Sequence, residues 1–185
     1  MNQITAVSVD DFKKLIQNTK KKRFKVAFLL AFGSGMRLSE IVGGPREKGK
    51  KMIEGLTRDR VDMKAKCIYI KDAKEGKDRQ VPLPKGFKEW MLNLLPLDQT
   101  YSNCLSARRS LQRAFKTAAR KAGILKKNPK IHFHSLRHGF GTHMANQGVP
   151  IHHIKTLMGH SNISTTNVYL ESNPKKALES YEELF

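Results

Sequence analysis

A long amphipathic segment, residues 106–122, most constrains what this chain can fold into. Leu111, Phe115 and Ala118 recur at helical spacing as an apolar stripe, and Gly123 follows as a helix terminator. The opposite side is basic and consists of Arg108, Arg109, Arg113, Lys116, Arg120 and Lys121. A helix of this kind buries its apolar stripe against a core and leaves its basic side for solvent or for a partner.

Several further segments have the length and pattern of helices. Ser8, followed by Asp10 and Asp11, is typical of a helix start. Glycine or proline ends most of the segments, as Gly148 and Pro150 do after residue 146. The other expected helices cover residues 24–32, 87–95, 135–146, 151–158 and 174–185.

Two short segments have the character of strands. Residues 66–70 (KCIYI) and 79–83 (RQVPL) flank a polar turn, so they predict a β-hairpin, with Pro82 placing the second strand at an edge. Residues 43–55 are rich in Gly and Lys and predict an exposed loop. The fold class is therefore α+β: one mainly helical domain over residues 1–185 with a small antiparallel sheet.

The charge of the chain points to a polyanionic partner. Lys and Arg number 35 against 16 Asp and Glu, a formal net charge of +19. A solubility charge or attraction to anionic lipid would explain the excess less specifically. No apolar run approaches the roughly 20 residues of a membrane span, and no signal peptide is evident. With two cysteines that lack metal-type spacing, we expect a cytoplasmic protein that binds nucleic acid.

Five polar residues together suggest phosphodiester chemistry: Arg37, His134, Arg137, His160 and Tyr169. They supply guanidinium groups to hold a phosphate, imidazoles to bind it or to move protons, and a phenol to attack it. His134 and Arg137 are three residues apart at a helix start, so both side chains are expected to reach one anion. Each residue alone has an ordinary explanation, such as pairing of Arg37 with Glu40.

The histidines also raise the question of a metal site. All seven lie between residues 132 and 160, but the segment contains no HExxH motif and no Cys or carboxylate at ligand spacing. We therefore expect no metal. The seven are His132, His134, His138, His143, His152, His153 and His160.

Three motifs, in order, resemble those of a known family. GMRLSE (35–40), HSLRHGFGTHM (134–144) and LMGHSNISTTNVYL (157–170) resemble the conserved boxes of the tyrosine recombinases, also called the phage integrase family. The Xer-like members are the most similar, and the resemblance spans roughly residues 8–185. It implies the catalytic-domain fold of that family and site-specific recombination of DNA, as in integration.

The resemblance also implies a role for each residue. Arg37 and Arg137 would grip the non-bridging oxygens of the scissile phosphate, and His160 would hydrogen-bond to it. His134 would assist proton transfer at the hydroxyl of Tyr169, which attacks the phosphorus. The product is a 3′-phosphotyrosyl link and a free 5′-hydroxyl, and a 5′-hydroxyl from a partner strand then reverses the step. The covalent intermediate keeps the bond energy, so neither ATP nor a metal is needed.

A sixth residue enters only through the resemblance. Family members carry a lysine in a hairpin turn before a Val-Pro-Leu-type strand, and Lys74 of KDAKEGKDRQVPL takes that position. Its ammonium would protonate the departing 5′ oxygen. Lys71 and Lys77 are alternatives because the register of the turn is open.

The resemblance extends to DNA contacts and assembly. An N-terminal DNA-clamping domain usually precedes the catalytic one, so we expect a catalytic fragment or a minimal form. Residues 43–55 look like an insertion that contacts DNA phosphates or moves on binding. Residues 174–185 would dock on a neighbouring protomer, in a tetramer on double-stranded DNA, or pack on their own chain when it is isolated. The expected DNA-binding residues are Arg46, Lys48, Lys50, Lys51, Arg108, Arg109 and Arg113.

Two alternative functions stay open at this point. A type IB topoisomerase-like nicking and closing enzyme uses a similar residue set, and its product, relaxed plasmid without strand exchange, distinguishes it. A non-catalytic basic nucleic-acid-binding protein would explain the charge, but it does not require the five polar residues together.

Overall fold

The computed structural model describes residues 5–45, 52–71 and 78–159. Its helices are α1 (Val9–Gln17), α2 (Lys22–Gly33), α3 (Leu38–Val42), α4 (Cys104–Lys121), α5 (Ile124–Lys127), α6 (Ser135–Asn146) and α7 (Ile151–Met158). Two 3₁₀ helices are η1 (Arg58–Arg60) and η3 (Glu89–Leu94), and the strands are β1 (Gly44–Pro45), β2 (Met52–Ile53), β3 (Val61–Asp62), β4 (Cys67–Ile70) and β5 (Arg79–Pro82). The mainly helical α+β architecture predicted from the sequence is thereby confirmed.

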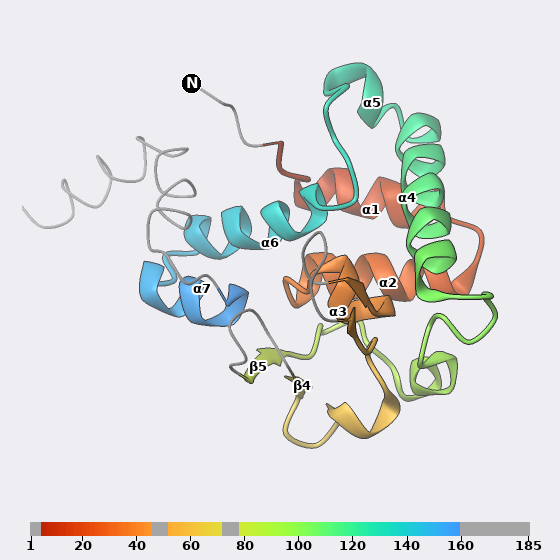
Figure 1. Ribbon diagram of the computed structural model, residues 1–185. Helices are drawn as coiled ribbons and strands as arrows, with labels where there is room; N and C mark the ends of the chain where they lie inside the picture. The colour runs from red at the N-terminus through yellow and green to blue at the C-terminus, as the bar shows by residue number, and fades with distance from the viewer. Residues whose placement is uncertain (1–4, 46–51, 72–77, 160–185) are drawn as a thin grey trace, which may run out of the picture.

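The hydrophobic core is centred on α2, which contacts α1, α3, α4 and α6 (Figure 1). Phe28 of α2 is fully buried, and its ring lies 5.9 Å from that of Phe115 on α4 and 5.9 Å from that of Phe133. These edge-to-face contacts bring α4 and the segment before α6 onto the same face of α2. The core therefore fixes the relative positions of α2, α4 and α6.

The predicted helix ends are largely confirmed. Ser8 caps α1 by accepting a hydrogen bond from the Asp11 amide (3.1 Å), and α6 and α7 have the predicted bounds. The long helix α4 begins at Cys104, two residues earlier than expected, because the Asn103 side chain accepts from the Ser106 amide (2.9 Å). The segment expected as a helix over 87–95 contains instead η3, whose buried Leu92 and the following Leu95, three residues apart, suit 3₁₀ spacing.

The predicted hairpin is part of a three-stranded antiparallel sheet in the order β3-β4-β5. Ile68 of β4 pairs with Val81 of β5, and β5 is an edge strand, as Pro82 indicates. The first strand, β3, is only Val61–Asp62 and was too short to predict. The helix α7 contacts β5, so the sheet edge and the α7 end meet (Figure 1).

The prediction of an exposed loop over residues 43–55 is wrong at both ends. Gly44 and Pro45 pair antiparallel with Ile53 and Met52, and Gly43, Gly44, Ile53 and Gly55 are buried. The two backbones pack so closely that a Cβ on Gly43 would lie 3.0 Å from the Ile53 carbonyl oxygen. The glycines of this segment therefore allow close packing, whereas residues 46–51 lie outside the described part.

Close packing also explains a glycine inside α6. A Cβ on Gly139 would lie 2.4 Å from the Val7 carbonyl oxygen and 2.8 Å from the Phe32 ring. We predict that Gly139→Ala lowers the free energy of unfolding by about 1–3 kcal/mol, although alanine favours helix, because the backbone at Val7 must shift. Urea unfolding at neutral pH measures the change.

Gly86→Ala is the matched control, since a Cβ there meets only Leu29 methyl groups at 3.7 and 3.8 Å. We expect its unfolding free energy to stay within about 0.5 kcal/mol of the original chain. An equally small effect of Gly139→Ala would contradict the close approach of Val7 to α6.

Candidate active site

Three successive carbonyl groups at the C-terminal end of α7 each accept a hydrogen bond from a different arginine. The bonds run from Arg79 Nε to Leu157 O (3.0 Å), from Arg137 Nη2 to Met158 O, and from Arg37 Nη2 to Gly159 O (2.9 Å). Carbonyls at a helix C-terminus lack partners within the helix and carry partial negative charge, so cations are favourable there. The arginines come from β5, α6 and the start of α3, so the α7 end joins three separate parts of the chain.

The carboxylate of Glu40 lies between two of these arginines. Its oxygens accept a bidentate pair of hydrogen bonds from Arg79 Nη1 and Nη2, both 2.9 Å, and one from Arg37 Nη1 at 3.0 Å. The Arg37 amide also donates to Glu40 Oε2 (2.7 Å), which caps the first turn of α3. Pairing of Arg37 with Glu40 therefore occurs, and it is part of a larger cluster.

The arginines determine the ionisation of Glu40. Its side chain is only 3% exposed, and burial alone would raise the pKa of the carboxyl group. The charge and hydrogen bonds of Arg79, followed by the charges of Arg37 and Arg137, outweigh burial and lower the pKa to about 2. Glu40 is thus an anion at neutral pH and holds the surrounding cations in place.

Arg137 is buried, with 1% of its surface exposed. Its Nη1 donates to the carbonyl of Gly35, a residue with a left-handed backbone (φ +64°), while its Nη2 reaches Met158. That Arg137 and His134 reach one anion together stays a prediction; Arg137 is buried there, whereas His134 is exposed. Backbone carbonyls satisfy the buried guanidinium, which makes its burial possible.

His134 is the N-cap residue of α6, and its ring packs edge-on against His138 at 4.8 Å between centroids. The ring is accessible to solvent but lies in a hollow, so its hydration is incomplete. This desolvation, followed by the charges of His138 and Arg137, lowers the pKa of His134 to about 3. Desolvation, followed by the charge of Arg137, likewise lowers the pKa of His138 to about 4. Both imidazoles are therefore neutral at neutral pH.

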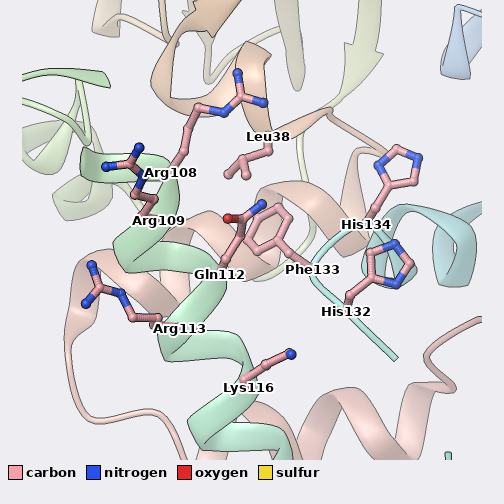
Figure 2. A pocket seen from close by; sticks show the side chains of 9 residues that line it. All are labelled: Leu38, Arg108, Arg109, Gln112, Arg113, Lys116, His132, Phe133 and His134. Carbon is pink, nitrogen blue, oxygen red and sulfur yellow. The ribbon is translucent and has the colours of Figure 1, made fainter. Parts of the chain in front are cut away.

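The hollow beside His134 has a volume of about 600 Å³ and is strongly basic. Figure 2 shows the side chains of α4 on one side of it and the rings of His132 and His134 on the other. Arg109 and Arg113 are exposed, whereas Arg108 Nη1 donates to the Pro45 carbonyl (3.2 Å). The residues that line the hollow are Leu38, Arg108, Arg109, Gln112, Arg113, Lys116, His132, Phe133 and His134.

Several predicted site residues lie outside the described part of the chain: Lys74, His160, Tyr169, Arg46, Lys48, Lys50 and Lys51, together with residues 174–185. Within the described ranges, no group of His, Cys, Asp and Glu could hold a metal ion. Among the described helices, none combines the length and apolar character that a membrane span requires.

Arg79 was not predicted as a site residue. A signal for it was present, because residues two apart in a strand face the same side and Val81 is buried in the core. Arg79 was therefore expected on the inner side of the sheet, where a guanidinium needs hydrogen-bond acceptors. The sequence did not show which acceptors, since Glu40 is 39 residues away.

A comparison with protein families decides the classification. The model of the phage integrase family matches residues 5–176. The chain belongs to the phage integrase family. Its similar relatives include the tyrosine recombinase XerA of Thermococcus kodakarensis, 31% identical over 172 residues, which cover 89% of this chain and 57% of the relative. XerA of Pyrococcus furiosus is 29% identical over 190 residues, covering 96% and 60% of the two chains. The chain thus spans less than two thirds of the length of these relatives.

Solved structures of the phage integrase family share the fold. A crystal structure of XerA recombinase matches with a TM-score of 0.65 and 23% identity, covering 96% of this chain and 64% of the other. The catalytic domain of bacteriophage HP1 integrase matches with a TM-score of 0.64 and 22% identity, covering 97% and 95%. The second match covers nearly all of a catalytic domain, so the fold of this chain is that of the family's catalytic domains.

The ionisation of Glu40 leads to a test of stability against pH. A folded pKa of about 2, below the ordinary 4.5, means that Glu40 contributes stability above about pH 4.5 that is lost as the pH falls toward 2. We predict that Glu40→Gln removes this part of the acid sensitivity. At neutral pH the variant should lose about 3–5 kcal/mol of unfolding free energy, because the buried Arg79 loses its carboxylate.

Urea unfolding across this pH range measures both effects. Glu54→Gln is the matched control, because Glu54 pairs with Arg60 but its side chain is 65% exposed. We expect that control to follow the original pH curve with little loss of stability. If Glu40→Gln and Glu54→Gln behaved alike, the central position of Glu40 would be refuted.

Proposed function

We propose that this chain is a site-specific DNA recombinase of the tyrosine type. Tyr169 attacks the scissile phosphodiester and forms a 3′-phosphotyrosyl bond while the 5′ oxygen leaves. A 5′-hydroxyl of a partner strand then attacks the phosphotyrosine, which restores a phosphodiester and frees Tyr169. The bond energy stays in the covalent intermediate, so the cycle consumes no ATP. In support, the solved relatives include XerH recombinase bound to its difH substrate in a post-cleavage complex.

One observation carries the proposal: Arg37 and Arg137 converge on the carbonyls of Met158 and Gly159. These residues directly precede His160, and Tyr169 follows nine residues after it. In the sequence, a histidine therefore comes directly after the arginine cluster, and the tyrosine follows in the same motif. Arg37, whose side chain is 24% exposed, would contact the phosphate directly, and the buried guanidinium of Arg137 would add its positive charge from beneath. Together the two charges would stabilise a pentacovalent transition state.

The proton transfers follow from the properties of the groups. Tyr169 must lose its phenolic proton as it attacks. We assign that proton to His134 on the resemblance to the family; its ring is neutral at neutral pH, because its pKa is lowered to about 3. The 5′ oxygen must gain a proton as its bond to phosphorus breaks. We assign that proton to Lys74, on the resemblance to the family alone. His160 donates a hydrogen bond to the same phosphate.

The basic hollow beside His134 is a surface for the DNA backbone. Arg109 and Arg113 of α4 are exposed there, with Lys116 on the next turn. Guanidinium and ammonium groups bind phosphates without reading the sequence, and they release counterions when they do so. Arg108 already donates a hydrogen bond to the Pro45 carbonyl, so fewer of its N–H groups are available to bind DNA phosphates. The proposed contacts of Arg46, Lys48, Lys50 and Lys51 rest on their charge alone.

The sequence also supports a proposal about how the recombinase assembles on DNA. Residues 174–185 have an apolar edge, formed by Ala177, Leu178, Tyr181, Leu184 and Phe185, that a free tail would not need. We propose that this segment docks on a second copy of the chain within a tetramer on DNA.

The first test is covalent capture. A pool of duplexes with a fixed nick and randomised flanking sequence is incubated with the protein, and adducts that survive denaturation are sequenced. Because the short strand diffuses away after cleavage, the phosphotyrosyl intermediate accumulates. We predict adducts enriched in one sequence, and at least a thousandfold fewer with Tyr169→Phe.

The control variant Tyr101→Phe removes a hydroxyl that bonds to Ser110, away from the cluster, and should leave capture unchanged. Capture without any sequence enrichment, together with plasmid relaxation and no strand exchange, would favour a topoisomerase-like enzyme. No adduct on any duplex in the pool would refute the proposed chemistry.

The second test concerns the basic hollow. We predict that Arg109→Gln and Arg113→Gln each weaken binding to duplex DNA and each lower the slope of log affinity against log salt by about 1. Lys13→Gln, on the exposed side of α1, is the control and should leave the slope unchanged. Equal slopes for all three variants would show that the duplex lies elsewhere.

A further inference from the structure

We propose that Arg79 is a positioning residue for the proposed strand-cleavage reaction, acting through Glu40 and the end of α7. This inference rests on the proposed function, because it assigns a role in the same site. Arg79 is 7% exposed at its side chain and its three guanidinium nitrogens all donate to protein groups. It is therefore unsuited to contact DNA itself, and it differs in this respect from Arg37.

The planar fork of Arg79 connects two elements. Its Nη1 and Nη2 hold both oxygens of Glu40 at 2.9 Å, and its Nε holds the Leu157 carbonyl at 3.0 Å. A bidentate pair fixes orientation as well as distance, since the guanidinium and carboxylate become coplanar. Arg79 thus sets the separation between α3, which carries Arg37, and the α7 end, which precedes His160.

Gly159 shows how tightly this arrangement is packed. It caps α7 in a left-handed conformation (φ +60°), and a Cβ on it would lie 3.1 Å from both Cδ and Nη1 of Arg79. The backbone at Gly159 therefore rests on the Arg79 guanidinium. The position of Gly159, the last described residue at the end of α7, thus depends on the position of Arg79.

Arg79 also controls how Glu40 interacts with Arg37. Within the described residues, the Arg37 side chain donates one hydrogen bond to Glu40 and one to Gly159. Roughly three of its five N–H groups then remain for a phosphate. Without Arg79, each oxygen of Glu40 would lose one of its hydrogen bonds, and the Arg37 guanidinium would turn further toward the carboxylate and away from a phosphate. Saturation of Glu40 by Arg79 keeps Arg37 available.

The test separates positioning from stability. Adduct formation is followed in single turnovers on a nicked duplex taken from the captured pool, at temperatures where each variant is folded. With Arg79→Gln we expect the rate at saturating protein to fall about 10–100-fold, while the dissociation constant for the duplex changes less than about threefold. A residue needed only for stability would lower the melting temperature and leave this rate unchanged, which would overturn the proposal.

Two further variants sharpen the test. Arg79→Lys keeps the charge beside Glu40 but not the fork, so it should recover most of the stability and little of the rate. Recovery of both would show that charge alone matters. Arg60→Gln is the matched control, because Arg60 also pairs with a carboxylate, Glu54, near the same sheet. We expect its rate to stay within twofold of the original, as is usual for a site distant from the chemistry.

A second measurement needs no reaction at all. The Nε–H resonance of Arg37 and the amide resonance of Gly159 are followed by nuclear magnetic resonance in the original chain and in the variants. We expect both to shift in Arg79→Lys and in Arg79→Gln, and neither in Arg60→Gln. If the original chain captures no DNA, the proposed function fails while these shifts still decide the role of Arg79. Unshifted resonances in both Arg79 variants would refute it.

Discussion

The carboxylate of Glu40 is the interaction on which the rest of this site depends. It is buried, it receives a bidentate bond from Arg79, and it holds Arg37 from both the side chain and the amide. Removing a carboxylate from water is costly, and replacing a buried ion pair by apolar side chains is often neutral or even stabilising. The cluster is therefore better understood as a device for orientation: one anion fixes the directions of two cations that belong to different elements.

The end of α7 completes the arrangement. Three arginines bind the successive carbonyls of Leu157, Met158 and Gly159, so the partial negative charge of a helix C-terminus acts as a second anionic centre beside Glu40. The core of α2 with α4 and α6 supplies the rigid frame that carries Arg137 to this point. Beside it, the hollow of α4 and His134 offers basic side chains and a neutral imidazole. Phosphate binding, proton transfer and DNA contact can thus occupy adjacent parts of one surface.

Local sequence patterns predicted the local structure well. Gly148, Pro150 and Gly159 mark the bounds of α6 and α7, and the three-residue spacing of Arg37 and Glu40 indicated their pair. Long-range packing was less accessible. The partners of Arg79 lie 39 and 78 residues away, and the inward direction of Arg137 depends on carbonyls 102 and 21 residues away. Likewise, the glycines of residues 43–55 predicted a loop, although the glycines at both ends of this segment allow two backbones to pack closely.

Hydrogen–deuterium exchange of α7 shows whether the Glu40 cluster holds the end of this helix. If Glu40 and its arginines hold the end of this helix, Glu40→Gln should speed amide exchange over residues 151–159. Exchange over α4 (Cys104–Lys121), which packs on the core instead, should speed up only as far as the loss of global unfolding free energy requires. The predicted result is a larger increase in exchange rate over 151–159 than over α4. Unchanged protection of that segment would contradict the account, since the α7 end would then be held without the carboxylate.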